Sequence, residues 1–168
     1  MTKLYLVRHG ETVDNVNCII QGQTQGKLTA NGIKQAEMLA VEFAGIHLDA
    51  IVASDLARAV DTAEVIAIRH SLDVETTAML RERDWGGFTG RYIPDLEHEV
   101  WPDDIETLDN LLKRASEFIE WIKEKHHGET VLAVGHGIIN KAIQAVYLGK
   151  KMNEVQRMLN AEVRILEL

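Results

Sequence analysis

Short apolar runs alternate with long amphipathic stretches along the whole sequence, and this alternation restricts the fold more than any other feature. The runs have the length and composition of buried strands and cover residues 3–7, 50–53, 74–80, 130–134 and 162–168. Between them, apolar residues recur at helical spacing over residues 29–44, 54–66, 107–127 and 137–148. We therefore expect an α/β fold with three layers, α/β/α, in which helices cover both faces of a mostly parallel central sheet.

Capping residues set the expected helix boundaries. Thr29 and Ser54 have side chains that can accept hydrogen bonds from the first N–H groups of a helix, so each is expected to be an N-cap. Gly45 is expected to end the helix that begins after Thr29. That helix is expected to turn five apolar residues toward the core: Ile33, Ala36, Leu39, Ala40 and Phe43.

Length and composition fit one domain in a reducing compartment. The 168 residues include a single cysteine, Cys18, so the chain cannot form an intramolecular disulfide. No segment approaches the ~20 apolar residues of a membrane helix, and the N-terminus lacks the pattern of a signal peptide. We expect one cytoplasmic domain over residues 1–168 with a short acidic lid or rim insertion at about 84–106, and we leave the oligomeric state open.

Four groups that can carry chemistry follow four of the expected strands. Arg8-His9 follows the first strand, Ser54 the second, Glu82 the third and His136 the fourth. The carboxyl ends of parallel strands meet at one edge of an open α/β sheet, where such folds bind ligands. The order of the chain therefore predicts that these groups share one site.

The segment Arg8-His9-Gly10-Glu11-Thr12 has the groups that phosphoryl transfer needs. A neutral histidine nitrogen is a competent nucleophile toward phosphorus, and an adjacent guanidinium can hold phosphate oxygens with its forked donors. Gly10 would let the backbone approach the anion closely. The plainer interpretation is a histidine that is hydrogen-bonded into a turn at the end of a strand.

Two further segments indicate an anion site. His136 lies between Gly135 and Gly137 where a strand becomes a helix, and free N–H groups at a helix start attract anions. Arg58 lies in an expected first helical turn, where a cation is disfavoured unless a negative group compensates it. A bound phosphate would compensate it. The alternatives are that the glycines only shape a tight turn and that Asp55 only balances Arg58.

The overall charge limits the choice of partner. A net charge of −8 argues against general nucleic-acid binding and against long-range attraction of an anionic substrate. A phosphate pocket in this chain must therefore be a local cluster of positive charge, formed by side chains such as Arg8 and Arg58.

Together these segments resemble the histidine phosphatase superfamily, the phosphoglycerate mutase-like proteins. RHGET at residues 8–12 matches the family signature, and His136-Gly137 matches the segment of its second histidine. Three further stretches look like the family's first helix, its SDLxRAxxTA segment and its acid-bearing loop LRERDWGGFTG: residues 28–36, 54–63 and 80–90. The resemblance spans about residues 3–149 in the family's order.

The resemblance implies a role for each matched residue. His9 would be the phosphorylated nucleophile, Glu82 the general acid, and Arg8, Arg58 and a protonated His136 the cationic pocket. The implied substrate-binding residues are Gly10, Asn15, Gln21, Gly22 and Gly137. The implied activity is hydrolysis of a small phosphorylated metabolite through a phosphohistidine, with no metal and no cofactor. Glu82 would protonate the leaving oxygen and then deprotonate the attacking water.

A mutase of the same family is the nearest alternative, because it shares all of these residues. The family's mutases are longer and carry extra basic residues between the acid loop and the second histidine. Here residues 91–107 contain one arginine and six carboxylates: Asp95, Glu97, Glu99, Asp103, Asp104 and Glu106. These carboxylates are expected to lie at the rim and repel a second phosphate. The mutases also tend to have Asn where this chain has Ile138, so a phosphatase is preferred.

Three more distant alternatives find less support. A metal-dependent phosphoesterase would need ligand spacings such as HxH or HExxH, and a serine hydrolase would need GxSxG; the sequence has none of them. A non-catalytic phosphate-binding module would lack the nucleophile or the acid, but His9 and Glu82 are both present. The sequence leaves open whether Trp85, Phe88 and Trp101 line the substrate rim or pack in the core.

Overall fold

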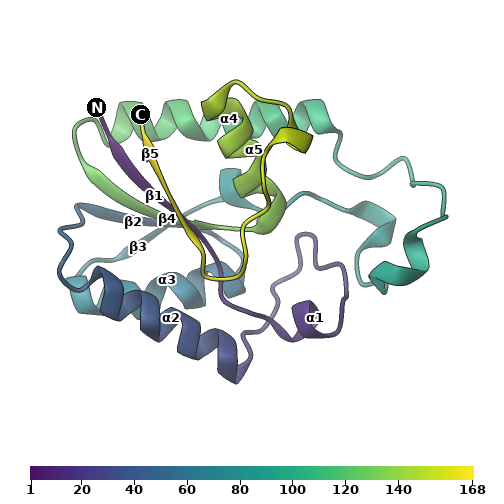
Figure 1. Cartoon of the computed structure of the whole chain (residues 1–168), viewed down its shortest axis with the longest axis horizontal. Coiled ribbons are helices and arrows are strands. Elements are labelled where there is room, and N and C mark those ends of the chain that lie inside the picture. The colour runs from purple at the N-terminus through teal and green to yellow at the C-terminus, as the bar shows by residue number, and fades with distance from the viewer.

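The computed structural model describes residues 1–168 and shows one sheet with helices on both faces (Figure 1). The strands are β1 (Lys3–Arg8), β2 (Ala50–Ser54), β3 (Val74–Thr77), β4 (Thr130–Gly135) and β5 (Val163–Glu167). The α-helices are α1 (Val13–Val16), α2 (Ala30–Phe43), α3 (Ala57–His70), α4 (Leu108–Lys125) and α5 (Gly137–Leu148). Short 3₁₀ turns occupy Ala78–Leu80, Gly86–Phe88, Ile93–Leu96 and Met152–Glu154.

The sheet is mostly parallel, with the strand order β3-β2-β4-β1-β5. Three neighbouring pairs are parallel, and only β5 runs antiparallel, against β1. Arg8 at the end of β1 lies opposite Gly135 at the end of β4, and Ala53 near the end of β2 lies opposite Val134. The predicted three-layer α/β fold is confirmed, and its register brings the predicted site residues to one edge of the sheet.

Each face of the sheet is buried by a pair of helices. Alternate side chains of β1 point to opposite faces: Leu4 and Leu6 pack in the core under α4 and α5, whereas Tyr5 and Val7 pack in the core over α2 and α3. Figure 1 shows α4 and α5 above the sheet and α2 and α3 below it. Burial on both faces explains why β1 reads as a nearly continuous apolar run rather than an alternating one.

Two details of the helices differ from the sequence predictions. Ser54 is not an N-cap, because it is the last residue of β2 and pairs with Thr77 of β3, so α3 begins only at Ala57. Ile33 is 46% exposed rather than buried, because the inward stripe of α2 includes its neighbour Gly32. Thr29, by contrast, is an N-cap as predicted, with its Oγ1 accepting a hydrogen bond of 3.0 Å from the N–H of Gly32.

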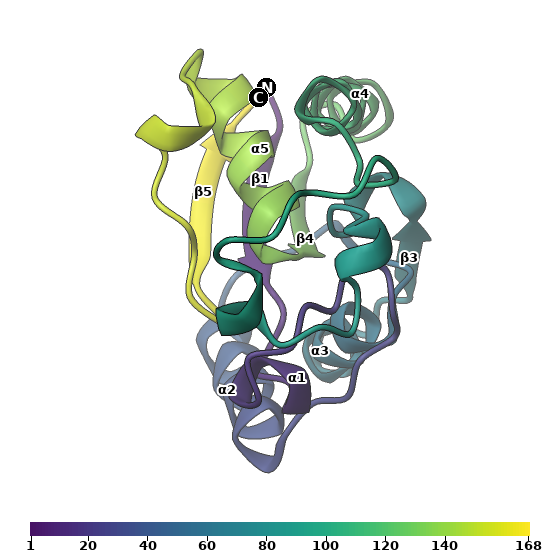
Figure 2. The same cartoon turned by 90° about the vertical axis from the view of Figure 1, so that its right-hand side faces the viewer.

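Two loop regions form an outer wall beyond the carboxyl ends of the strands. One lies between β1 and α2 and contains the short helix α1, which the sequence pattern did not indicate. The other, residues 84–106, is here called the rim. Backbone hydrogen bonds join them, from Ile20 N to Arg91 O (3.0 Å) and from Ile93 N to Cys18 O (2.8 Å). Figure 2 shows the rim crossing in front of the sheet edge, with α1 beside it.

The rim has a small core of its own, formed by Phe88, Leu96 and Ile105. The chain reaches the rim through β3, which is shorter than predicted and gives way to a 3₁₀ turn at Ala78–Leu80. No helix combines the length and the apolar composition needed to cross a membrane.

Candidate active site

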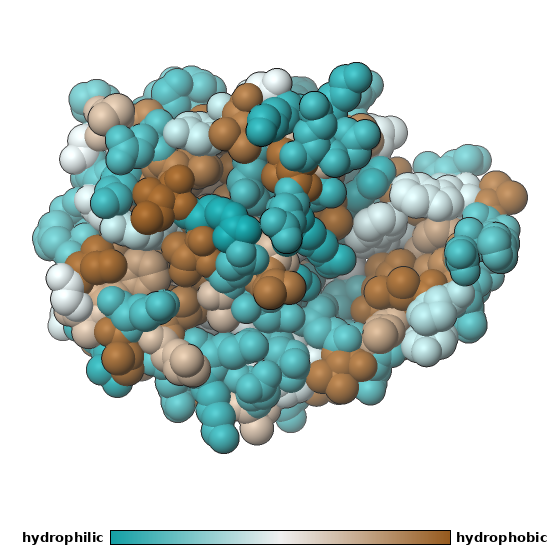
Figure 3. Space-filling model, in the orientation of Figure 1, coloured by the Kyte–Doolittle hydropathy of each residue, from teal (hydrophilic) through white to brown (hydrophobic).

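A cavity of about 490 Å³ lies between the sheet edge and the outer wall, a size that suits a small ligand. Figure 3 shows the surface hollowed between the body of the molecule and the projecting rim. Six of the ten predicted site residues line the cavity: Arg8, Asn15, Gln21, Gly22, Arg58 and Glu82. The lining residues that sequence reasoning missed include three isoleucines and four residues with polar or reactive side chains, Asp14, Cys18, Arg157 and Asn160.

His9 is buried and is not among the lining residues, but it directly follows Arg8, which lines the cavity, and its form suits nucleophilic attack. Its Nδ1 is 2.7 Å from the carbonyl oxygen of Gly10. A carbonyl oxygen can only accept, so Nδ1 must carry the proton and Nε2 keeps its lone pair. Burial, and then the positive charge of Arg58, hold the pKa of His9 well below its ordinary value. The imidazole is therefore neutral at neutral pH.

His136 contacts His9, with 5.1 Å between the ring centroids and 61° between the ring planes. It is fully buried, and neither of its ring nitrogens has a hydrogen-bond partner. Burial and then the charge of Arg58 lower its pKa well below the ordinary value, so His136 is neutral here. The prediction that it adds a positive charge to the pocket is therefore wrong for this arrangement. Buried polar atoms without partners indicate a group that a ligand can satisfy.

Two buried arginines supply the positive charge of the site. Arg8 donates from Nη1 to the carbonyl oxygen of Met158 (2.8 Å), and Arg58 donates from Nη2 to that of Gly22 (2.8 Å). The Nε of each has no partner. Burial is the main cause that lowers both pKa values to about 10, so both side chains remain charged at neutral pH. Buried cations without a carboxylate partner favour binding of an anion.

Asn15 is oriented for a ligand by the cap of α1. Its Oδ1 accepts from the N–H of Thr12 (3.0 Å) and from Nδ2 of Asn160 (3.1 Å), so its own amide group remains available to donate. Asn160 also donates to the carbonyl oxygen of His9 (3.2 Å). Asn160 lies in a loop without a recognisable motif, and no local signal could have identified it. Gln21 is held by Thr12, whose Oγ1 donates to its Oε1 (3.0 Å).

Glu82 occupies the N-terminus of α5. Its carboxylate accepts hydrogen bonds from the N–H groups of Ile138 (3.1 Å), Ile139 (3.0 Å) and Arg83 (2.8 Å). The free N–H groups that were predicted to hold phosphate at this helix start are thus engaged with Glu82. The carboxylate lies close enough to the cations for its charge to raise the pKa of Arg8 and of Arg58.

Two glycines of the predicted site make room for neighbouring groups. Gly10 does not line the cavity; its N–H donates to Oγ1 of Thr62 (3.1 Å), and a Cβ at this position would lie 2.6 Å from the carbonyl oxygen of Gly32. A Cβ at Gly137 would lie 2.7 Å from Nε of Arg157. Gly10 therefore lets β1 approach the start of α2, and Gly137 makes room for a guanidinium.

The rim contributes aromatic rather than acidic groups to the cavity. Trp85 lines it, while Trp101 packs against Trp85 with 5.5 Å between ring centroids, and Phe88 is buried. None of the six carboxylates of residues 91–107 is among the lining residues. Glu99 pairs with Arg91 at 2.5 Å instead, and Glu106 pairs with Arg114 at 2.7 Å. The expected repulsion of a second anion therefore has no basis in the cavity wall.

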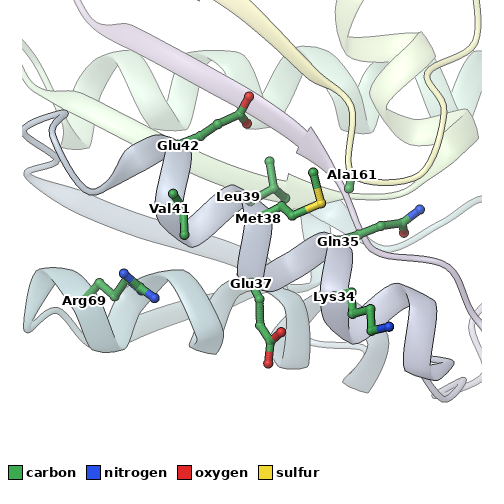
Figure 4. A pocket seen from close by; sticks show the side chains of 9 residues that line it. All are labelled: Lys34, Gln35, Glu37, Met38, Leu39, Val41, Glu42, Arg69 and Ala161. Atoms are coloured by element: carbon green, nitrogen blue, oxygen red, sulfur yellow. The ribbon is translucent and has the colours of Figure 1, made fainter.

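Outside this cavity, the structure offers no metal site but has a larger hollow. No group of three or more His, Cys, Asp or Glu side chains is placed to hold a metal ion. A wider, more open hollow of about 870 Å³ lies over the outer face of α2 and reaches Arg69 and Ala161 (Figure 4). It does not contain any of the residues that carry chemistry.

The fold and this edge of the sheet define a class: a three-layer α/β protein in which two contacting histidines lie among buried arginines that line a small cavity. The family model described as the histidine phosphatase superfamily (branch 1) matches residues 4–168. The chain therefore belongs to the histidine phosphatase superfamily, and it is an enzyme of the phosphatase type.

Individual relatives agree with this assignment. The chain is 33% identical over 163 residues to a protein of Escherichia coli named "Probable phosphoglycerate mutase GpmB", covering 89% of this chain and 76% of that one. Among solved structures, Bacillus stearothermophilus YhfR has a TM-score of 0.90 at 30% identity. The match covers 100% of this chain and 92% of the YhfR chain. The phosphoserine phosphatase of Entamoeba histolytica in complex with 3-phosphoglyceric acid has a TM-score of 0.88 at 26% identity. The match covers 98% of this chain and 90% of that one.

Proposed function

We propose that the protein hydrolyses small phosphomonoesters through a phosphohistidine formed on His9, without a metal ion. The observation that carries this proposal is the state of His9: a neutral imidazole whose proton is held on Nδ1 by Gly10, beside the buried cations Arg8 and Arg58. A nucleophile of low pKa beside fixed positive charge suits attack on a phosphate dianion, because phosphoryl transfer depends on positioning and on charge stabilisation.

In the first half of the reaction, the substrate phosphate binds between Arg8 and Arg58, with the amide of Asn15 and a ring nitrogen of His136 as further partners. Nε2 of His9 forms a bond to phosphorus, and the bond between phosphorus and the leaving oxygen breaks. Glu82, in its protonated form, gives its proton to that oxygen, so a neutral alcohol leaves.

In the second half, a water molecule attacks the phosphohistidine. The Glu82 carboxylate takes a proton from the water, the bond between phosphorus and Nε2 breaks, and His9 returns to its starting form. Inorganic phosphate then leaves, and Glu82 is again protonated for the next cycle.

We also propose that residues 1–168 act as one domain, with the rim as the outer wall of its site, and that the enzyme is cytoplasmic. The single cysteine supports a reducing compartment. A net charge of −8 argues against nucleic acid as the partner, and the local cluster of Arg8 and Arg58 supports a small phosphorylated substrate.

Replacement of His9 tests the proposal. His9→Ala should reduce hydrolysis of an aryl phosphate by several orders of magnitude, because no other side chain replaces a covalent nucleophile. Wild type quenched during turnover should contain an acid-labile phosphoryl group on His9 by mass spectrometry, and chelator should leave its activity unchanged. Substantial activity of the alanine variant would overturn the proposal. Transfer to a second hydroxyl group instead of water would favour the mutase reading, in line with the name of the E. coli relative.

A further inference from the structure

We infer that Arg157 binds a second anionic group of the substrate, a carboxylate on the alcohol that leaves, and so sets a preference for carboxylated phosphomonoesters. This inference rests on the proposed function, because it concerns the same cavity. Arg157 lies in the loop between the Met152–Glu154 turn and β5, outside every segment that pointed to phosphate chemistry.

The position of Arg157 places its charge at the cavity. The side chain lines the cavity together with Arg8 and Asn160. Its guanidinium lies against the backbone of Gly137. A Cβ added to Gly137 would lie 2.7 Å from Nε and 2.8 Å from Nη2 of Arg157. After burial, its charge is the next cause that lowers the pKa of Arg8.

Arg157 has no carboxylate partner, as is also true of Arg8 and Arg58, whereas four arginines that do not line the cavity are paired. Arg81 pairs with Asp55, Arg91 with Glu99, Arg114 with Glu106 and Arg164 with Glu162. A forked cation at a cavity wall, without a protein carboxylate, is suited to a planar carboxylate from a ligand.

The transferring phosphate already has its own cations, and they lie deeper. Arg8 is 8% exposed and Arg58 is 1% exposed, whereas Arg157 is exposed to solvent. A phosphate held by the buried pair therefore leaves Arg157 for whatever the alcohol part carries. The only lining carboxylates are Asp14 and Glu82, and Glu82 is engaged with the start of α5.

A matched pair of substrates tests this inference. 3-Phosphoglycerate and glycerol 3-phosphate are both primary alkyl phosphates with a neighbouring hydroxyl. They differ at one carbon, which is a carboxylate in the first and a hydroxymethyl group in the second. Wild type should prefer the first. Arg157→Gln should lower kcat/KM for 3-phosphoglycerate roughly 10- to 100-fold, as expected for the loss of a hydrogen bond to a charged group. The same variant should change kcat/KM for glycerol 3-phosphate by less than about 3-fold.

Two further variants complete the design. Arg157→Lys keeps the charge but not the fork, so it should retain part of the preference. Arg69→Gln removes an exposed arginine of α3 that lies over the distant hollow, and should leave both rates unchanged.

The outcomes separate this inference from the proposed function. If wild type hydrolyses both esters but Arg157→Gln lowers both rates equally, Arg157 binds the transferring phosphate and the inference is wrong. If neither rate changes, the inference is also wrong, and the phosphatase proposal is untouched. Failure of wild type on these esters and on aryl phosphates alike would instead overturn the proposed function, and this inference with it.

Discussion

Arg114 of α4 and Glu106, at the end of the rim, form an ion pair with 2.7 Å between Nη2 and Oε1, and the N–H of Asp84 in the loop that carries Glu82 donates to the same Oε1 (3.2 Å). Arg114 also donates from Nη1 to the carbonyl oxygens of Arg81 (2.6 Å) and Met79 (3.0 Å). Burial alone would raise the pKa of Glu106, but hydrogen bonds from Arg114 and other donors outweigh it, and the pKa lies below the ordinary value. The pair thus holds the acid-bearing loop against the body of the molecule.

Arg114→Leu should therefore damage both the stability and the general acid step. Removal of Arg114 takes away the cation of the Glu106 carboxylate, which keeps the Asp84 N–H and Asn110 Nδ2 as donors, so the cost in the free energy of unfolding should be at most about 3–5 kcal/mol. Urea unfolding of the variant measures this cost. Among folded molecules, hydrolysis of an alkyl phosphate should fall more than that of an aryl phosphate, because only the alkyl ester needs a well-placed Glu82. Arg114→Leu together with Glu106→Leu should recover part of the stability. An unchanged unfolding midpoint in the single variant would refute the bracing role.

Glu82→Gln should separate substrates by their need for an acid. Glutamine keeps the shape and can still accept from Ile138, but it cannot give a proton to the leaving oxygen. An alkyl phosphate should lose about 10²–10⁴-fold in rate, whereas an activated aryl phosphate should lose much less in its phosphorylation step. Rapid mixing with the aryl ester should then show a burst of phenolate, because the following hydrolysis still lacks its base.

The control for that experiment is Asp84→Asn, two residues along the same loop. Asp84 donates its N–H to Glu106 and does not line the cavity, so its variant should retain discrimination between the two esters. Equal losses on both esters in Glu82→Gln, without a burst, would show that Glu82 is not the acid.

His9 and His136 should make the protein less stable in mild acid. Both pKa values are lowered by folding, so below the unfolded value of about 6.5 the unfolded chain binds more protons than the folded one. The free energy of unfolding should therefore be fully retained above that pH and fall below it, by up to about 1.4 kcal/mol per pH unit for each group. Urea midpoints between pH 5 and 8, in buffers without phosphate or sulfate, measure this dependence.

Two variants test whether the buried histidines cause this pH dependence of the stability. His136→Asn should make the slope shallower, whereas His127→Gln, at an exposed position, should leave it as in wild type. If the slope is the same in all three proteins, the buried histidine pair is not its source.

Gly10→Ala should cost stability through packing. The added Cβ would lie 2.6 Å from the carbonyl oxygen of Gly32, and backbone cannot move aside as a flexible side chain can. We expect a loss of roughly 1–3 kcal/mol, the usual cost of overpacking. Gly45→Ala is the matched control, because a Cβ at Gly45 meets nothing within 4 Å. Thermal unfolding of both variants measures their stabilities. Equal stability of the two would contradict the packing role of Gly10.

The sequence by itself determined the layers of the fold and indicated, in part through the family resemblance, the proposed nucleophile, acid and arginines of the candidate site. Apolar periodicity reports the burial of each element, and in a parallel sheet the residue that follows each strand must lie at the same edge. Local order therefore indicated Arg8, His9 and Arg58, whereas the role of Glu82 as the acid came from the family resemblance. Ile33 was placed wrongly because a period of 3.6 residues leaves the edge of a helix face undefined until a neighbour packs on it.

Only the tertiary structure decided how the site is held together and which charges it has. Asn15 and Asn160 are 145 residues apart in the chain yet share a hydrogen bond, and Arg157 meets Gly137 from a different loop. The pKa of His136 is lowered by its burial and by the nearby Arg58, which the sequence could not show. These are properties of contacts between distant segments, and no local pattern encodes a distance, a desolvation or the field of a neighbouring charge.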